Sequence, residues 1–166
     1  MSNQPDHNAC PFCRIIAGQL PASVVHREEH WLVLMDIHPL RPGHVLIIPR
    51  QHAGHLHQFD PARQQRLFVL ADAVLRAQQQ VDPTVAGANL LLNDGSAANQ
   101  HIPHLHLHCI PRRHRDSLGF TLGLLARTAG IFGIARKRRR LDAQAEHLRQ
   151  VLAQLPALGQ ATSQHR

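Results

Sequence analysis

The stretch His104-Leu105-His106-Leu107-His108-Cys109-Ile110 is the most informative part of this sequence for its fold. Histidines alternate with apolar residues, and the side chains of a β-strand alternate between the two faces of a sheet. We therefore predict a core strand over 104–110 that ends at Pro111. Its three imidazoles share one face, about 6.5–7 Å apart, and its apolar side chains share the other.

Three imidazoles in a row indicate chemistry. The unperturbed pKa of histidine is about 6.5, so near neutral pH the ring can act as a nucleophile, a proton donor or a metal ligand. A neutral imidazole nitrogen can attack an electrophilic phosphorus, and neighbouring rings can donate hydrogen bonds to the phosphate oxygens. The alternatives are a polar strand face in a chain with 15 histidines, or an incidental metal-binding tract.

The segments before this strand predict an α+β fold. We expect a short helix over 10–17, strands over 24–26, 31–36, 44–49 and 89–92, and a loop over 82–87. The strongest helix signal starts at Asp60-Pro61, an N-cap residue followed by proline at the first helical position, and continues to about Gln80. This order predicts a mostly antiparallel sheet of about five strands with one long and one short helix.

The termini differ from this central part. We expect a disordered leader over 1–9, a domain over 10–112 and a basic, partly helical extension over 113–166, whose residues 141–155 form an amphipathic helix. The formal net charge is +7, yet the first 110 residues are close to neutral, because the run 136–140 alone carries five positive charges. That run is either a solvated linker or a surface for nucleic acid or another anionic partner.

The cysteines suggest a metal site. There are three, Cys10, Cys13 and Cys109, and an odd number argues against a disulfide framework. Cys10 and Cys13 form a C-x-x-C pair at a helix start, which suits a tetrahedral zinc that has two more ligands. Unliganded thiols and a redox pair are the alternatives. No apolar stretch approaches the ~18–20 residues of a membrane span, so we expect a cytoplasmic protein without membrane contact.

The pattern of residues 104–110 resembles the signature of the histidine triad (HIT) family. Further blocks resemble those of the family in the same order: Cys10-Pro-Phe-Cys13-Arg-Ile-Ile-Ala-Gly, Leu34-Met-Asp36-Ile-His-Pro, Pro42-Gly-His44-Val-Leu-Ile-Ile-Pro-Arg-Gln-His52 and Asn93-Asp-Gly. The resemblance covers roughly residues 10–112. It implies a homodimeric hydrolase or nucleotidyltransferase that attacks the α-phosphate of a purine nucleotide through a covalent nucleotidyl-histidine. Nucleoside phosphoramidates and dinucleoside polyphosphates are the implied substrates.

The same resemblance implies roles for individual residues. His106 is the nucleophile, His108 donates to the phosphate and the leaving group, and His44 also reaches the phosphate. The implied nucleotide-binding residues are Asp36 at the ribose hydroxyls, Ile37 at the base, and Asn93, Gln100 and His101 around the phosphate. Two positions depart from the family pattern. Asn99 stands where glycine is usual, and His101 where a small hydroxyl residue is frequent, which bears on the leaving-group side of the pocket.

For the metal, the family pattern implies a closed, structural zinc site. Its four ligands are Cys10, Cys13, His52 and His104, with His55 or His57 as substitutes for His52. No catalytic metal or organic cofactor is implied. Two other functions remain open: a nucleotide-binding scaffold without turnover, and a nucleic-acid binder that works through the basic extension.

Overall fold

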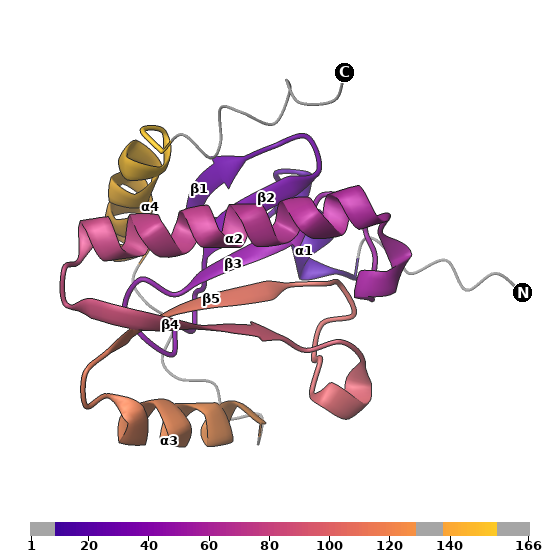
Figure 1. The fold of residues 1–166 in the computed structure, drawn as a ribbon. Helices are drawn as coiled ribbons and strands as arrows, with labels where there is room; N and C mark the ends of the chain where they lie inside the picture. The colour runs from indigo at the N-terminus through magenta and orange to yellow at the C-terminus, as the bar shows by residue number, and fades with distance from the viewer. Residues whose placement is uncertain (1–8, 129–137, 156–166) are drawn as a thin grey trace, which may run out of the picture.

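The computed structural model describes residues 9–128 and 138–155. Its centre is a five-stranded antiparallel sheet in the order β1-β2-β3-β5-β4 (Figure 1). The strands are β1 Val24–Arg27, β2 Trp31–Met35, β3 Val45–Pro49, β4 Val85–Leu92 and β5 Leu107–Arg113. The helices are α1 Pro11–Ile16, α2 Pro61–Val81, α3 Ser117–Thr128 and α4 Arg138–Leu152, with short 3-10 turns η1 Leu56–Gln58 and η2 Ser96–Ala98. The predicted α+β class is confirmed.

One face of the sheet packs against α2 and α4. Helix α2 starts as predicted, because the Asp60 carboxylate accepts a hydrogen bond from the N–H of Arg63 at 2.9 Å and Pro61 follows as the first helical residue. Alternate strand residues meet the buried faces of the two helices. The side chains of this core include Val33, Ile47, Leu107, Leu67, Leu70, Val74, Leu141 and Leu148.

The opposite face of the sheet packs against α1. The side chains of β2 and β3 that do not face α2 point here, and they form a second apolar cluster with Cys10 and Phe12. Every residue of β2 and β3 is buried, which explains why both strands are continuous apolar runs. The sheet therefore has one large core under two helices and a smaller core under the N-terminal turn.

The histidine segment enters its strand later than predicted. Strand β5 begins at Leu107, because the N–H of Leu105 donates to the carbonyl of Ala53 at 2.7 Å instead of to a neighbouring strand. The predicted alternation holds. Leu105, Leu107 and Cys109 lie in the core under α2 and α4. The rings of His104 and His106 pack against Phe12 on the other side of the sheet.

The same strand also ends later than predicted. Pro111 lies inside β5 and pairs with Ala88 of β4. Proline is tolerated there because β3 pairs with β5 only from Leu107 to Cys109, so the nitrogen of Pro111 lies beyond the ladder with β3. The longer β5 gives β4 a partner as far back as Val85, so the loop predicted over 82–87 is wrong from residue 85 onward.

The C-terminal part contains two helices. Helix α4 confirms the predicted amphipathic helix, with Leu141, Ala145, Leu148 and Leu152 buried. Helix α3 was not predicted, because its apolar sequence is interrupted by Gly119 and Gly123. The predicted leader, apart from residue 9, and residues 136–137 of the basic run lie outside the described residues. Among the helices described, none has the length and apolar character needed to cross a membrane.

Candidate functional site

Two of the predicted catalytic histidines line a small cavity of about 100 Å³. The start of β5, the loop after β4 and helix α3 form its walls. Among the lining residues are His106, His108, Asn93, His101, Asn99, Leu124 and Arg127. The first four were predicted as site residues. Asn99 was singled out only as a departure from the family pattern, and the two residues of α3 were not anticipated.

The backbone fixes the tautomer of His106. Its Nδ1 lies 2.7 Å from the carbonyl oxygen of His104. A carbonyl only accepts hydrogen bonds, so Nδ1 carries the ring proton. In the neutral ring, Nε2 then keeps its lone pair, which is the form that a nucleophile requires.

A chain of hydrogen bonds places the ring proton of His108 on Nε2, whereas that of His106 is on Nδ1. The N–H of Leu40 donates to Nδ1 of His44 at 3.1 Å, so we assign the proton of His44 to Nε2. That Nε2–H lies 3.0 Å from Nδ1 of His108 and donates to it. The proton of His108 is therefore on Nε2, and the ring is a donor. Since the ring centroids of His106 and His108 are 5.0 Å apart, a lone pair and an N–H donor stand side by side.

Burial keeps all three of these imidazoles neutral. Removal from water lowers the pKa of His44 to about 4, although the nearby Asp36 carboxylate acts in the opposite direction. Burial also lowers the pKa of His106, and it brings the pKa of His108 well below its ordinary value, where His44 and His106 add to the effect. Near pH 7 the site therefore presents a neutral nucleophile and a neutral donor.

Asp36 directly follows β2, and its carboxylate is 4% exposed. Its Oδ1 accepts from the N–H of His38 at 2.8 Å, and its Oδ2 accepts from Nη2 of Arg127 at 2.9 Å. Burial alone would raise the pKa of Asp36. The groups around it, His44 and Arg127 foremost, more than offset that effect, and the pKa lies below its ordinary value. The carboxylate is thus ionised, and a residue of α3 is its partner.

Three predicted nucleotide-binding residues, Asp36, Ile37 and Gln100, do not line the cavity. Ile37 follows Asp36 and is 45% exposed. Gln100 braces two loops, since its Oε1 accepts from the N–H of Gly95 at 2.9 Å and its Nε2 donates to the carbonyl of Gly54 at 2.9 Å. Asn99 adopts the left-handed conformation, with φ of 60° and ψ of 35°. The asparagine therefore takes the backbone geometry that glycine accommodates most easily.

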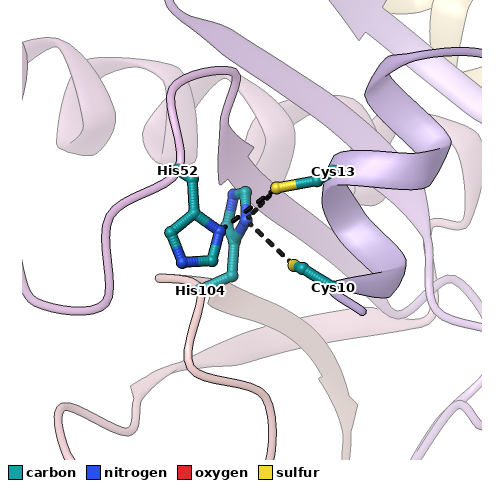
Figure 2. Close-up of side chains that lie close together, drawn as sticks. All are labelled: Cys10, Cys13, His52 and His104. Carbon is teal, nitrogen blue, oxygen red and sulfur yellow. Dashed lines mark hydrogen bonds between the residues drawn. The ribbon is translucent and has the colours of Figure 1, made fainter. Parts of the chain in front are cut away.

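The four predicted metal ligands come together at one end of the site. Cys10 and Cys13 at the start of α1 face His52 and His104 (Figure 2). Cys13 Sγ lies 3.1 Å from Nδ1 of His52, and Cys10 Sγ lies 3.4 Å from Nδ1 of His104. Zinc with ligands at about 2.0–2.3 Å in a tetrahedron needs ligand atoms roughly 3.3–3.8 Å apart. The cluster is close to that size.

The chemistry of the donors also suits a metal. Nε2 of His104 lies 2.9 Å from the carbonyl of Pro49, so it carries the proton, and the lone pair of Nδ1 faces the thiols. Burial and the neighbouring Cys10 raise the pKa of the Cys13 thiol to about 11. Zinc binds the thiolate form, so binding of the ion would release this proton.

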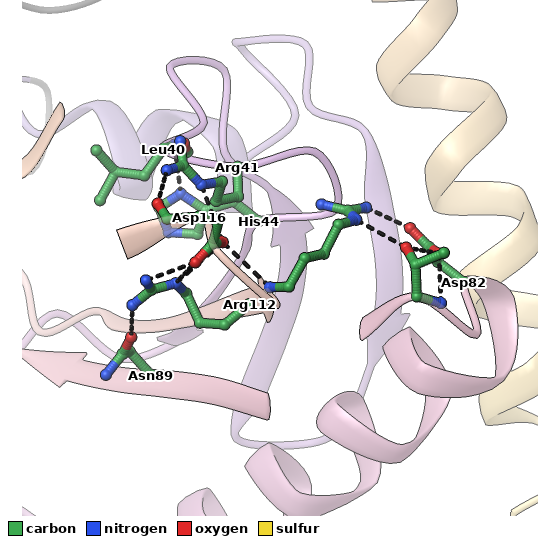
Figure 3. Close-up of polar contacts among 9 residues, drawn as sticks. Leu40, Arg41, His44, Asp82, Asn89, Arg112 and Asp116 are labelled. Carbon is green, nitrogen blue, oxygen red and sulfur yellow. Dashed lines mark hydrogen bonds and ion pairs between the residues drawn. The ribbon is translucent and has the colours of Figure 1, made fainter. Parts of the chain in front are cut away.

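Helix α3 is fixed beside the cavity by a partly buried charge cluster. Asp116, just before α3, accepts from Arg112 at 2.6 Å and from Arg41 at 3.2 Å, and Arg112 also donates to Asn89 (Figure 3). The guanidinium of Arg112 lies 3.8 Å from the ring centroid of Phe120, on the first turn of α3. No local sequence signal identifies Arg127 as a site residue, because its partner Asp36 is 91 residues away.

Comparisons with known proteins agree with this geometry. A family model described as HIT domain matches residues 17–115. An uncharacterized HIT-like protein of Mycobacterium tuberculosis is 32% identical over 151 residues, which cover 91% of this chain and 98% of that protein. An adenosine 5'-monophosphoramidase of Candida albicans is 33% identical over 120 residues, covering 70% of this chain and 78% of that protein. A Zn-bound histidine triad family protein from Mycobacterium smegmatis superposes with a TM-score of 0.72 at 30% identity, covering 92% and 99% of the two chains.

Proposed function

This chain belongs to the HIT domain family, and from that premise we propose that it is a nucleotide hydrolase or nucleotidyltransferase with His106 as its nucleophile. The observation that carries the proposal is the bond from His106 Nδ1–H to the carbonyl of His104, which leaves the lone pair of Nε2 for attack. The donor His108 beside it supports the same assignment.

The proposed reaction has two displacements at the α-phosphorus. In the first, Nε2 of His106 forms a bond to phosphorus while the bond to the leaving group breaks. His108 Nε2–H donates a hydrogen bond to the phosphate and to the leaving atom as charge develops there, and the leaving group takes from solvent the proton that the attacking water returns to solvent in the second step. In the second, water or another acceptor attacks phosphorus, His106 departs with its electron pair, and the nucleotide is released. Splitting one displacement into two lowers the barrier of each.

The substrate we propose is a purine nucleoside phosphoramidate or a dinucleoside polyphosphate. The phosphoramidase activity named for the Candida albicans relative supports the first of these. In this proposal Asp36 accepts from the ribose hydroxyls and Ile37 lines the base pocket. His44 supports the phosphate through His108, Asn93 and His101 contact the phosphate side, and Gln100 holds the loop that carries Asn99.

We also propose that Cys10, Cys13, His52 and His104 bind one structural zinc ion. When bound, the ion supplies a cross-link between the start of α1 and the segment that leads into β5. His104 would bind the zinc ion through its ring, and the carbonyl of His104 accepts the hydrogen bond that orients His106. His104 therefore connects the metal cluster to the orientation of the nucleophile.

Turnover of an adenosine phosphoramidate tests the proposal. Wild-type protein should release AMP, and His106→Ala should lower the rate by about 10⁴-fold or more, since loss of a covalent nucleophile costs up to about 10⁶. His108→Ala should cost about 10²–10³-fold, the range for loss of one donor that stabilises developing charge. His147→Ala is the matched control, because His147 is an exposed histidine on α4. A His106→Ala variant as fast as this control would refute the proposal.

A further inference from the structure

The carboxylate of Asp36 is already occupied by a residue of α3. Arg127 donates to it through Nη2 at 2.9 Å and donates through Nη1 to the carbonyl of His38 at 2.9 Å. The side chain of Arg127 is 20% exposed and that of Asp36 is 4% exposed, so the pair is largely shielded from water. In the proposed function the ribose hydroxyls need this same carboxylate. The guanidinium therefore occupies Oδ2, one of the two oxygens that the ribose hydroxyls would use.

The cavity beside this pair is too small for a nucleoside. Its volume is about 100 Å³, and Leu124 and Arg127 of α3 form part of its wall. Pockets that hold organic ligands start at about 300 Å³. A phosphate-sized anion fits against His106 and His108, and α3 takes up space beside Asp36 that a ribose would use.

We propose that the Asp36–Arg127 pair is a latch on the active site, and that α3 must release it before a nucleoside can bind. The inference rests on the proposed function, since it assigns the ribose to Asp36. On binding, the ribose hydroxyls replace the guanidinium as the partner of the carboxylate. The apparent Kd for a nucleotide is then the intrinsic Kd divided by the fraction of molecules in which the latch is open.

The construction of α3 suits this role. Its N-terminal end is anchored by Asp116, which Arg41 and Arg112 both contact. Its C-terminal end is held to the sheet by Arg127. Between the ends, the side chains of Leu118 and Leu122 are 76% and 58% exposed, so part of the apolar surface of α3 faces solvent. The helix can therefore swing about the Asp116 end when the Arg127 end is released.

Calorimetric titration with AMP and with orthophosphate tests the latch. Arg127→Ala should bind AMP about tenfold tighter than wild type, because no pair has to open. It should bind orthophosphate equally or more weakly, because orthophosphate fits the closed cavity and the variant has lost a positive charge. Arg127→Lys should fall between the two proteins. Arg139→Ala is the control, since it removes the same charge from an exposed position on α4. Thermal unfolding of each variant verifies that it is folded.

The outcomes separate the latch from the proposed function. If wild type binds AMP and Arg127→Ala binds it equally or more weakly, the latch is refuted and Arg127 is a substrate ligand or a bystander. If neither protein binds AMP, the proposed function fails and the latch fails with it. Hydrogen exchange of wild type gives a second measurement that needs no variant. AMP should speed exchange of the α3 amides, and unchanged or slower exchange there would contradict the latch.

Discussion

Each of three histidines in this site has one ring nitrogen that is hydrogen-bonded to a different backbone group. Pro49 accepts from Nε2 of His104, the carbonyl of His104 accepts from Nδ1 of His106, and the amide of Leu40 donates to Nδ1 of His44. Chemically identical rings are thereby given different roles: a metal-facing lone pair, a lone pair suited to attack, and the start of a donor chain. The sequence alone predicted the alternation of faces, but a tautomer depends on which backbone atom lies opposite each ring.

The buried neutral histidines make stability depend on pH. The pKa of His44 is about 4 in the folded protein and about 6.5 in the unfolded chain, so the unfolded state binds the extra proton first. Stability is full above about pH 6.5 and is lost as pH falls toward 4. From His44 alone, urea unfolding at pH 5 should give a free energy about 2 kcal/mol lower than at pH 7.5. Equal values at the two pH values would contradict the neutral assignment.

Asn99 gives a test of backbone strain. Asn99→Ala should lower the free energy of unfolding by about 1 kcal/mol, because a β-carbon at φ of 60° is strained and alanine lacks the local hydrogen bonding of asparagine. Asn99→Gly should cost less than the alanine substitution, since glycine adopts this conformation freely. Ala98→Gly is the control in the preceding residue and should destabilise. An alanine variant as stable as the glycine variant at position 99 would count against this explanation.

At the scale of elements, the metal cluster joins α1 to the segment before β5. Chelation of a bound zinc ion should lower the midpoint of thermal unfolding by about 8–16 °C, since linkage of about 4 kcal/mol is typical at a thousandfold excess over Kd. Cys13→Ser should lose bound zinc, as measured with a colorimetric chelator. Cys109→Ala should retain it, because that thiol lies in the other core. Wild-type protein purified with added zinc but containing no bound metal would refute the site.

The elements also separate what local sequence predicts from what it does not. The N-cap and proline of α2, the buried runs of β2 and β3 and the apolar stripe of α4 are local signals, and all four elements were predicted. The two ends of β5 and the length of β4 depend on pairing between distant segments. At the first end of β5, the loop carbonyl of Ala53 takes the place of a strand partner for Leu105. At the other end, β3 pairs with β5 only as far as Cys109, so Pro111 can continue the strand.

Helix α3 is the clearest case of long-range control. Its sequence has glycines at two positions and no polar stripe, so local signals do not place it. Two ion pairs position it: Asp116 with Arg41, 75 residues away, and Arg127 with Asp36, 91 residues away. The family resemblance identified Asp36 as a site residue, and its partner could be found only in three dimensions. Among the metal ligands, the C-x-x-C spacing predicted Cys10 and Cys13, and the family resemblance implied His52 and His104.

At the scale of the whole molecule, α2 and β4 leave an apolar surface uncovered. Phe68 and Val69 of α2 are 48% and 44% exposed, and Leu90 of β4, an edge strand, is 42% exposed. We propose that two copies of the chain associate through this surface. Sedimentation velocity should give a dimer for wild type and a monomer for Phe68→Asp. Leu122→Asp is the control, a similarly exposed apolar residue on α3. A wild-type monomer at micromolar concentration would refute the dimer.

The central claim is a covalent bond from His106 to the nucleotide. Wild-type protein mixed with an adenosine phosphoramidate and quenched within milliseconds should gain the mass of one adenylyl group, and peptide mapping should place that group on His106. The adduct should decay as AMP forms. An adduct on another residue, or rapid AMP release with no adduct at any quench time, would contradict the account.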